Sequence, residues 1–250
     1  MSQTVVVTAA THGEISRMLE TLGGRMLDTA GGFPVWGTET AAGRVIMAVT
    51  GMGKINAAAA TALLCERHGP ELIINTGCAG AFPESGLTLG DLALATVEVT
   101  ADEGVDTKGG WLSYRDIGIA AVERQGMRYY NEFPLSPVAA LRALRLAEEL
   151  GVTLVSGKFL TLSTCSGSAE RGRRLYERSG APLCENMEGA AVAQVALRYG
   201  VACLEIRGVS NLVEDRDLAR WNIPLAVERA EMFLLRFIAD WRGERLICPS

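Results

Sequence analysis

The chain has 250 residues with a net charge of −5 at pH 7, and 48% of its residues are hydrophobic. This acidic balance gives no general electrostatic attraction to nucleic acid, and no apolar run reaches the roughly 18 residues of a membrane span, so neither partner is expected. The length suffices for one large core, and no Pro/Ser-rich linker divides the chain. We therefore predict a single domain over residues 1–250.

The cysteines and histidines indicate neither a disulfide framework nor a metal site. None of the six cysteines belongs to a CxxC pair, and most have apolar neighbours, which is typical of reduced thiols in a cytoplasmic protein. The amino terminus lacks the pattern of a secretory signal. His12 and His68 have no metal-ligand spacing around them, so we expect no metal. The cysteines are Cys65, Cys78, Cys165, Cys184, Cys203 and Cys248.

Short apolar segments alternate along the chain with longer segments of helical periodicity. Strands are predicted at 4–9, 44–50, 71–76, 91–98, 158–163 and 202–208, and helices at 13–22, 53–68, 137–151, 168–179, 187–199 and 223–240. This alternation predicts an α/β fold with a largely parallel sheet covered on both faces. Residues 100–135 have little periodicity, and an irregular segment of that length usually covers a site or an interface.

Three candidate features follow the first three strands. Glu14 comes just after strand 4–9, where a carboxylate can act as a general base or simply compensate a helix dipole. The stretch 49–64, VTGMGKINAAAATALL, is either a tight strand-to-helix turn or a turn that approaches a sugar or an anion. It is not a Walker A loop, because Ala48 and Ile55 replace the required Gly and Ser/Thr. The stretch 71–82, ELIINTGCAGAF, is either an ordinary turn or a backbone N–H site for an anion or sugar hydroxyls.

Further polar candidates lie in the stretch 185–217. Glu188 stands at a predicted helix start, followed by small residues that let a ligand approach the backbone. Its carboxylate can accept hydrogen bonds from two adjacent hydroxyls or merely begin the helix. Arg207, Ser210 and Asn211 follow at the carboxyl end of a buried strand, the edge at which open α/β sheets bind small ligands.

Taken together, these motifs resemble the purine nucleoside phosphorylase and nucleosidase superfamily. The shared order is a strand followed by Glu, then GxGKxNAA, NTGxAG, MEGAA and Arg-x-x-Ser-Asn, over about residues 4 to 240. The nucleosidase branch, typified by methylthioadenosine/adenosylhomocysteine nucleosidase, is the more similar one. The resemblance implies a single-domain, three-layer, nucleoside phosphorylase-like α/β fold with a central mixed β-sheet. It also implies a small-molecule nucleoside substrate, a homodimer or larger homo-oligomer, and no cofactor.

The resemblance also implies roles for individual residues. Glu14 would activate the attacking water, Glu188 would take the 2′ and 3′ hydroxyls of the ribose, and Asn211 would contact the leaving purine. Cys78 stands where those enzymes usually carry Ser or Thr. Trp221 would border the 5′ substituent of the sugar. The substrate-binding residues implied in this way are Gly77, Cys78, Ala79, Thr164, Met187, Glu188, Arg207, Ser210 and Trp221.

The stretch 210–228, SNLVEDRDLARWNIPLAVE, resembles the futalosine hydrolase branch of the superfamily, which releases hypoxanthine from futalosine in a route to menaquinone. Adenine-specific members carry Asp at position 211, whereas an Asn donates N–H bonds to N7 and to a 6-oxo group. The leaving-group acid stays open: Asp215 and Asp217 are candidates, or exposed loop charges. Futalosine carries a benzoate at its 5′ end, so the resemblance also implies a cation near the mouth of the pocket, for which Arg216 and Arg220 are candidates by position. A phosphorylase, with Arg207 as a possible anion ligand, an adenine nucleosidase and a non-catalytic nucleoside-binding protein are the alternatives.

Overall fold

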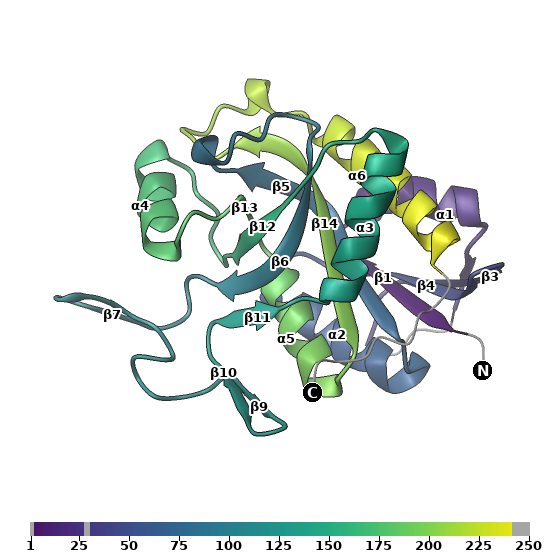
Figure 1. The fold of residues 1–250 in the computed structure, drawn as a ribbon, viewed down its shortest axis with the longest axis horizontal. Helices are drawn as coiled ribbons and strands as arrows, with labels where there is room; N and C mark the ends of the chain where they lie inside the picture. Colours follow the sequence, from purple (N-terminus) through teal and green to yellow (C-terminus); the bar gives the residue numbers. More distant parts are fainter. Residues whose placement is uncertain (1–2, 28–30, 242–250) are drawn as a thin grey trace.

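The predicted alternation of strands and helices is confirmed in the computed structural model, which describes residues 3–27 and 31–241 (Figure 1). The main strands are β1 (Thr4–Ala9), β4 (Gly43–Val49), β5 (Leu72–Ala81), β6 (Leu92–Thr100), β12 (Leu154–Thr161) and β14 (Ala202–Leu212). The helices are α1 (Ser16–Leu22), α2 (Lys54–His68), α3 (Pro137–Leu150), α4 (Ala169–Ser179), α5 (Gly189–Tyr199) and α6 (Ile223–Asp240). Short 3₁₀ turns are η1 (His12–Glu14), η2 (Pro83–Ser85) and η3 (Leu218–Arg220).

Ten of the described strands form one sheet, which is mixed rather than largely parallel. Strand β1 lies parallel between β4 and β5, and β5 lies parallel to β14. Strand β14 is antiparallel to β6, which runs parallel to β12. The short strand β13 (Cys184–Asn186) then pairs parallel with β12 and antiparallel with β5. These pairings join β5, β14, β6, β12 and β13 into a closed ring.

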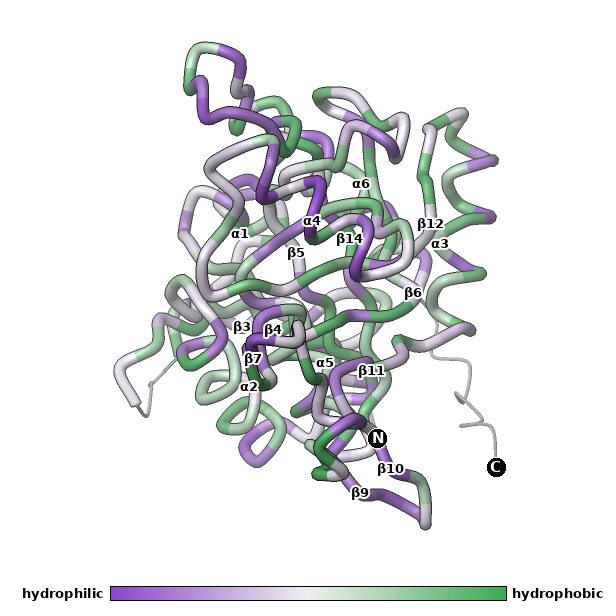
Figure 2. The backbone as a smooth tube through the Cα atoms, turned by 90° about the vertical axis from the view of Figure 1, so that its left-hand side faces the viewer, coloured by the Kyte–Doolittle hydropathy of each residue, from purple (hydrophilic) through white to green (hydrophobic). Residues whose placement is uncertain are grey.

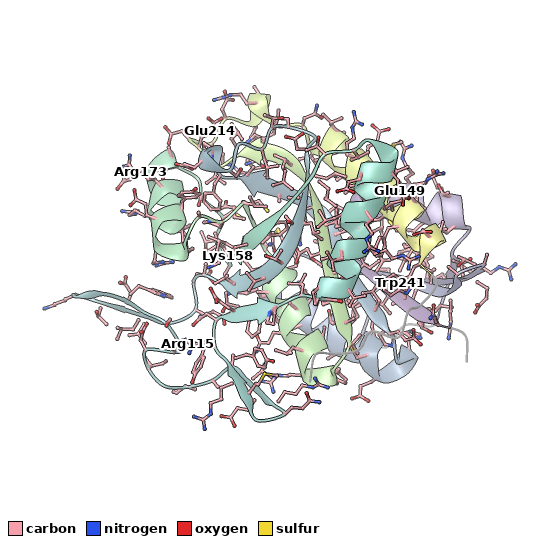
Figure 3. The ribbon with its side chains drawn as sticks, in the orientation of Figure 1. Arg115, Glu149, Lys158, Arg173, Glu214 and Trp241 are labelled. Atoms are coloured by element: carbon pink, nitrogen blue, oxygen red, sulfur yellow. The ribbon has the colours of Figure 1, made fainter. Side chains whose placement is uncertain are left out.

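Helices cover both faces of the sheet, as the resemblance implied. Helices α2 and α5 pack on one face, where their alanines meet the side chains of Ile73 and Cys203. Helices α1, α3 and α6 pack on the other face, against Leu204 and Ile206 of β14. Hydrophobic and hydrophilic residues alternate along the outer helix α3 with the helical period (Figure 2), and its buried residues lie on one face. Charged side chains such as Arg173 and Glu214 lie at the periphery (Figure 3).

Two of the central strands extend further than predicted. Strand β5 continues through the NTGCAG motif to Ala81, and β14 continues to Leu212, where the two strands still pair. The expected turn after Asn75 was therefore wrong, and Ser210 and Asn211 lie inside β14 rather than beyond its end. Small residues and glycines indicate a turn when the sequence is considered locally, but pairing between neighbouring strands overrides that local preference.

The segments without clear periodicity contain short, mostly exposed strands. Strands β2 (Arg25–Met26) and β3 (Val35–Thr40) extend the sheet beyond β4. Residues 100–135 hold the hairpins β7–β8 (Val105–Thr107, Gly110–Leu112) and β9–β10 (Val122–Arg124, Met127–Tyr129), followed by β11 (Glu132–Pro134). Both hairpins project from the body of the protein (Figure 1). Strands of three exposed residues are too short to show an apolar alternation, so the sequence could not predict them.

Candidate active site

Glu14 is fixed on two sides at the entry to the first helix. It ends the 3₁₀ turn η1, where its Oε2 accepts hydrogen bonds of 2.9 Å from both the backbone N–H and the hydroxyl of Thr11. Its Oε1 accepts a bond of 3.2 Å from the backbone N–H of Cys78 in β5. The residue is only 8% exposed. The capping interactions and the contact with β5 thus hold one carboxylate oxygen beside the NTGCAG strand.

Glu188 is the N-cap residue of α5 and is 4% exposed. Its Oε1 accepts a hydrogen bond of 2.9 Å from the backbone N–H of Gly53, at the amino end of α2, and its Oε2 accepts one of 3.3 Å from Arg207 Nη2. The Gly turn of residues 51–53 therefore does approach an anion, and in this structure the anion is the protein's own carboxylate.

Arg207 connects these elements from the interior of the sheet. Its guanidinium is 2% exposed and contacts four protein oxygens: Glu205 Oε1 at 2.6 Å, Asn75 Oδ1 at 2.6 Å, the Cys78 carbonyl at 3.0 Å and Glu188 Oε2 at 3.3 Å. The sequence implied a substrate ligand at this position. The geometry instead favours a residue that holds Glu188 and β5 in place.

Gly77 is what allows Glu14 and Arg207 to meet at β5. Its backbone has φ +146°, and a Cβ at this position would lie 2.4 Å from Glu14 Oε1 and 3.1 Å from Arg207 Nη1. Any side chain would therefore displace the carboxylate of Glu14. In this structure the NTGCAG motif is part of a strand that lacks a side chain at Gly77, and the polar groups of η1 and β14 meet at that point.

Asn211 lies on the same strand as Arg207, with its side chain held locally. Its Oδ1 accepts a bond of 2.8 Å from the Ser210 hydroxyl, and its Nδ2 donates to the Leu212 carbonyl at 3.0 Å. In the sheet it pairs with Gly80, which pairs on its other side with Glu185 of β13. The Nδ2 of Asn211 and the Cγ of Glu185 would lie 3.0 and 3.6 Å from a Cβ at Gly80. Asn211 and Glu185 therefore flank the same glycine.

Glu185 is a buried acid that the sequence analysis did not select. The backbone N–H and the hydroxyl of Ser166 bind its two oxygens, each at 2.7 Å. Burial raises the pKa of this carboxyl, and the bonds from Ser166 counteract that rise only in part. No periodic pattern marks a three-residue strand, so only its position two residues before Met187 could have drawn attention to it.

The substrate-binding roles of the remaining candidate residues stay predictions. Ser210 is buried and bonds the Ala79 carbonyl at 3.2 Å, whereas Met187 is half-buried and Thr164 is exposed. Trp221 is half-buried, with the guanidinium of Arg216 4.7 Å from its ring centre. Cys78 is half-buried, and burial, reinforced by the charge of Glu14, raises the pKa of its thiol to about 11.

The two proposed leaving-group acids have local structural roles instead. Asp215 accepts a bond of 3.0 Å from the backbone N–H of Ala169 at the start of α4. Asp217 is the N-cap residue of η3 and accepts one of 3.0 Å from Ala219. Both side chains are exposed. These contacts agree with the alternative that they are loop charges.

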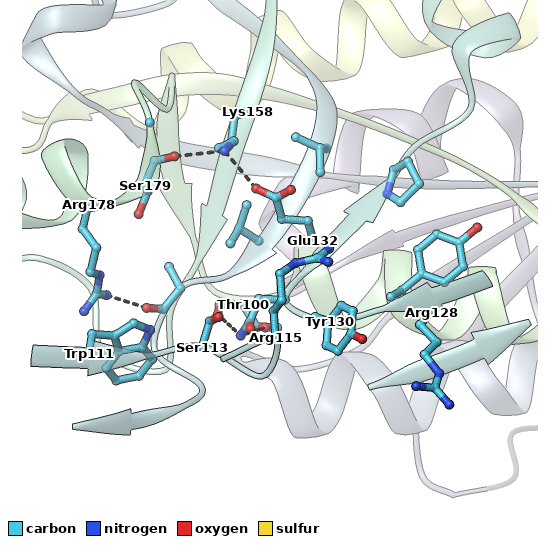
Figure 4. A pocket seen from close by; sticks show the side chains of 17 residues that line it. Thr100, Trp111, Ser113, Arg115, Arg128, Tyr130, Glu132, Lys158, Arg178 and Ser179 are labelled. Atoms are coloured by element: carbon cyan, nitrogen blue, oxygen red, sulfur yellow. Dashed lines mark hydrogen bonds and ion pairs between the residues drawn. The ribbon is translucent and has the colours of Figure 1, made fainter. Parts of the chain in front are cut away.

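Two cavities differ in their relation to these residues. One of about 780 Å³ lies between η1, α1 and the start of α6, and Glu14, Arg17 and Ile223 are among its lining residues. The other, of about 700 Å³, is lined by Trp111, Arg178 and further residues of the 97–134 and 158–180 segments, and contains none of the predicted site residues (Figure 4). Of the predicted site residues, Glu14 alone is among the described residues that line the first cavity, so this cavity adjoins the candidate site at that residue.

The described part of the chain contains no cluster of His, Cys, Asp and Glu that could hold a metal ion. Within the same residues, no helix is both long and apolar enough to cross a membrane. Five of the six cysteines are free thiols. Cys248 lies outside the described residues.

The phosphorylase superfamily model matches residues 4–239, nearly the whole chain. The chain belongs to the phosphorylase superfamily. Among the relatives of this superfamily member, a futalosine hydrolase of Thermus thermophilus is 38% identical over 78% of this chain and 82% of its own length. A 5′-methylthioadenosine/S-adenosylhomocysteine nucleosidase of Halalkalibacterium halodurans is 32% identical over 67% of this chain and 68% of its own.

A solved structure confirms the fold of this superfamily member. The native structure of futalosine hydrolase of Helicobacter pylori matches with a TM-score of 0.82 at 21% sequence identity, covering 96% of this chain and 98% of the other. This likeness bears on the fold alone. It confirms the nucleoside phosphorylase-like architecture and the mixed sheet that the motifs implied.

Proposed function

We propose that this protein hydrolyses the N-glycosidic bond of futalosine and releases hypoxanthine and dehypoxanthine futalosine, in menaquinone biosynthesis. The observation that carries the proposal is the convergence of Glu14 and Glu188, two buried carboxylates on different elements, at the glycine-rich part of β5 through Cys78 and Arg207. The 38% identity to a futalosine hydrolase supports the choice of substrate.

In the proposed reaction, a water attacks C1′ of the ribose while the bond to the purine breaks. Glu14 takes one proton of that water and later returns it to solvent. The electrons of the broken bond move into the purine, which leaves as an anion and takes up a proton from solvent to give hypoxanthine. Glu188 orients the ribose hydroxyls and stabilises the positive charge that develops on the sugar. Asn211 would donate hydrogen bonds to N7 and to the 6-oxo group, once its amide turns from its local contacts toward the base. Glu14 and Glu188, unlike Asn211, are already held in place by hydrogen bonds, so they can act on the transition state without reorganising during the reaction.

Phosphorolysis is the first alternative, since a phosphorylase must bind a phosphate dianion. Arg207, the cation that the sequence offered for this purpose, is already engaged by the four oxygens described above. Burial of a guanidinium between carboxylates supports a structural counter-ion rather than a free anion ligand. Water is therefore the favoured nucleophile.

An adenine nucleosidase is the second alternative, supported by the 32% identity to a methylthioadenosine/adenosylhomocysteine nucleosidase. To decide among the alternatives, futalosine, inosine and methylthioadenosine would each be incubated with the purified protein without phosphate, and the free base followed by chromatography. Hypoxanthine from futalosine alone is expected. Adenine from methylthioadenosine, release that needs phosphate, or no release at all would each contradict the proposal.

A cation should bind the benzoate at the 5′ end of futalosine, and the structure suggests Arg17 for this role. Arg17 lines the cavity beside Glu14 and pairs with Glu228 at 2.9 Å, whereas Arg216 and Arg220, the candidates from sequence, are not among its lining residues. We predict that Arg17→Met raises KM for futalosine about tenfold, the effect of losing one charge-assisted hydrogen bond. Inhibition by inosine, which carries a hydroxyl at that end, should not change.

Arg216→Met is the matched control, because Arg216 covers Trp221 outside that cavity. Steady-state kinetics of both variants with futalosine, and inosine as competitor, measure the difference. A rise in KM for Arg216→Met and none for Arg17→Met would contradict the assignment and return the role to the sequence-based candidate.

A homo-oligomer and a cytoplasmic location remain part of the proposal. The apolar side chains of Met52 and Ile55, on either side of the start of α2, are exposed. Lys54, the first residue of α2, pairs at 2.6 Å with Asp102 at the start of the 100–135 segment. That segment exposes further large apolar side chains, namely Val105, Leu112, Ile117, Ile119 and Met127. Apolar residues gathered in this way support a contact with a second copy. A fully active monomer in light scattering would contradict it.

A further inference from the structure

Two carboxyl groups meet beneath the start of α5 without any contact with solvent. Glu98 of β6 and Glu205 of β14 are both 0% exposed. Their oxygens lie close together, because both carboxyls border the same glycine. A Cβ at Gly189, the first residue of α5, would lie 2.2 Å from Glu98 Oε1 and 2.3 Å from Glu205 Oε2. The glycine of the MEGAA motif thus makes room for a carboxyl pair that the proposed mechanism does not use.

The partners of the two carboxyls differ in charge. Oε1 of Glu205 accepts a bond of 2.6 Å from the guanidinium of Arg207, whereas its buried Oε2 has no hydrogen-bond donor among the residues that the structure describes. The oxygens of Glu98 accept hydrogen bonds from two neutral groups, the Thr161 hydroxyl and the Asn186 amide, each at 2.7 Å. Two ionised carboxylates in contact would repel, so one proton must lie between them. The cation beside Glu205 places the negative charge there and leaves the proton on Glu98.

The pair is connected to Glu188 from two directions. On one side, Arg207 bridges Glu205 and Glu188. On the other side, the oxygen of the Asn186 amide accepts the backbone N–H of Glu188 at 3.0 Å and that of Gly189 at 2.8 Å. Glu98 therefore orients Asn186, whose amide oxygen holds the backbone of Glu188 and Gly189. Glu205 shares the counter-ion of Glu188, Arg207.

We propose that Glu98 and Glu205 act as a proton-sharing positioning pair, with a neutral Glu98 and an ionised Glu205, which holds Glu188 ready to bind the ribose. Glu205 draws Arg207 away from Glu188, so that the Glu188 carboxylate keeps acceptor capacity for the substrate hydroxyls. The role assigned to Glu188 rests on the proposed function, whereas the protonation of the pair does not.

The electrostatics of the pair agree with this arrangement. Burial raises the pKa of Glu98 well above its ordinary value, and the neighbouring charge of Glu205 raises it further. Burial also raises the pKa of Glu205, but the charge of Arg207 acts against that rise. Charged or titratable groups facing the pair are Arg207 and Cys203 on β14, Cys184 on β13, and Glu188.

The arrangement predicts unequal effects of isosteric substitutions. Glu205→Gln leaves Arg207 with Glu188 as its main carboxylate partner, so that Glu188 keeps less acceptor capacity for the ribose. We expect KM for futalosine to rise about 10- to 100-fold, which is the usual loss of affinity when a group that orients a metal ligand is removed. A purely structural loss would instead reduce the amount of active enzyme, which lowers the apparent kcat and leaves KM unchanged. Glu98→Val removes the proton donor and the acceptors of Thr161 and Asn186, so it should also raise KM.

Glu98→Gln should recover part of what Glu98→Val loses, because a neutral amide can donate to Glu205 as the protonated acid does, and its oxygen can still accept from Thr161. The recovery is incomplete because the amide nitrogen cannot accept the bond that Asn186 donates to Glu98 Oε1. The four proteins, wild type, Glu98→Gln, Glu98→Val and Glu205→Gln, would be compared by steady-state kinetics with futalosine. Glu71→Gln, an exposed residue just before β5, is the matched control. Equal losses for Glu98→Gln and Glu98→Val, or an unchanged KM in Glu205→Gln, would overturn the proposal. Should Glu205→Gln fail to fold, the two Glu98 variants still decide.

The proton itself has a spectroscopic signature that does not depend on the substrate. The wild-type protein at neutral pH should show an infrared carbonyl band of a protonated carboxyl that Glu98→Gln lacks and Glu71→Gln retains. If Glu205→Gln lost that band and Glu98→Gln kept it, the proton would lie on Glu205, and the assignment would be overturned. If the wild-type protein did not act on futalosine, this band would still test the pair, so the two failures can be told apart.

Discussion

Glu14→Gln should lower the turnover of futalosine by about 10²- to 10⁴-fold, the usual loss when a general base is removed. The amide cannot take a proton from the attacking water, but it keeps the size of the side chain. Its oxygen can still accept the backbone N–H of Cys78, which lies 3.2 Å from the carboxylate, whereas its nitrogen cannot accept the backbone N–H of Thr11. KM should change little, because the proposed partner of Glu14 is the attacking water rather than the nucleoside.

Glu20→Gln provides the control for this variant, because Glu20 is an exposed carboxylate on α1 that also lines the cavity beside Glu14. Its turnover should equal that of the wild type. Single-turnover measurements at saturating futalosine would separate the chemical step from product release. Turnover unchanged in Glu14→Gln would remove Glu14 from the mechanism, and equal losses in both variants would indicate a general effect of charge in the cavity.

The long, strongly patterned elements of this chain were predictable because their signals are local. Helix α6 has the predicted bounds 223–240, and α2, α3 and α4 deviate by about a residue at one end. Each of these helices combines an apolar stripe with a recognisable end, such as the glycine after α2 or the proline that begins α3. The carboxylates Glu14 and Glu188 were also predictable as candidates, since each stands where an apolar strand or a small-residue helix begins or ends.

The geometry among those candidates could not be predicted in the same way. Nothing in the sequence indicates that Glu188 binds the backbone N–H of Gly53, 135 residues away, or that Glu98 meets Glu205. Glu98 and Glu205 interrupt otherwise apolar strands, where a buried acid cannot be told from one that faces solvent. Such contacts arise from strand order, and strand order here includes antiparallel pairs that the βαβ pattern does not reveal.

Arg207→Met should destabilise the fold by about 3–5 kcal/mol, because it leaves ionised buried carboxylates without their counter-ion. Glu205 lies 2.6 Å and Glu188 3.3 Å from the guanidinium, and all three side chains are almost fully buried. Methionine fills much of the volume but satisfies none of the four oxygens that Arg207 contacts. Urea unfolding with linear extrapolation would measure the loss, with Arg236→Met on the exposed part of α6 as the control.

The pH dependence of this loss distinguishes a missing counter-ion from poor packing. Burial already raises the pKa of Glu205 in the folded protein and Arg207 acts against that rise, so removal of the arginine raises this pKa further above the unfolded value. A group whose folded pKa is raised binds its proton preferentially in the folded protein, and stability then increases as the pH falls toward the ordinary carboxyl pKa of about 4.3. The deficit of Arg207→Met relative to the wild type should therefore shrink in acid. A deficit that stays constant from neutral pH to pH about 4.5 would mean that the arginine contributes by packing rather than by charge.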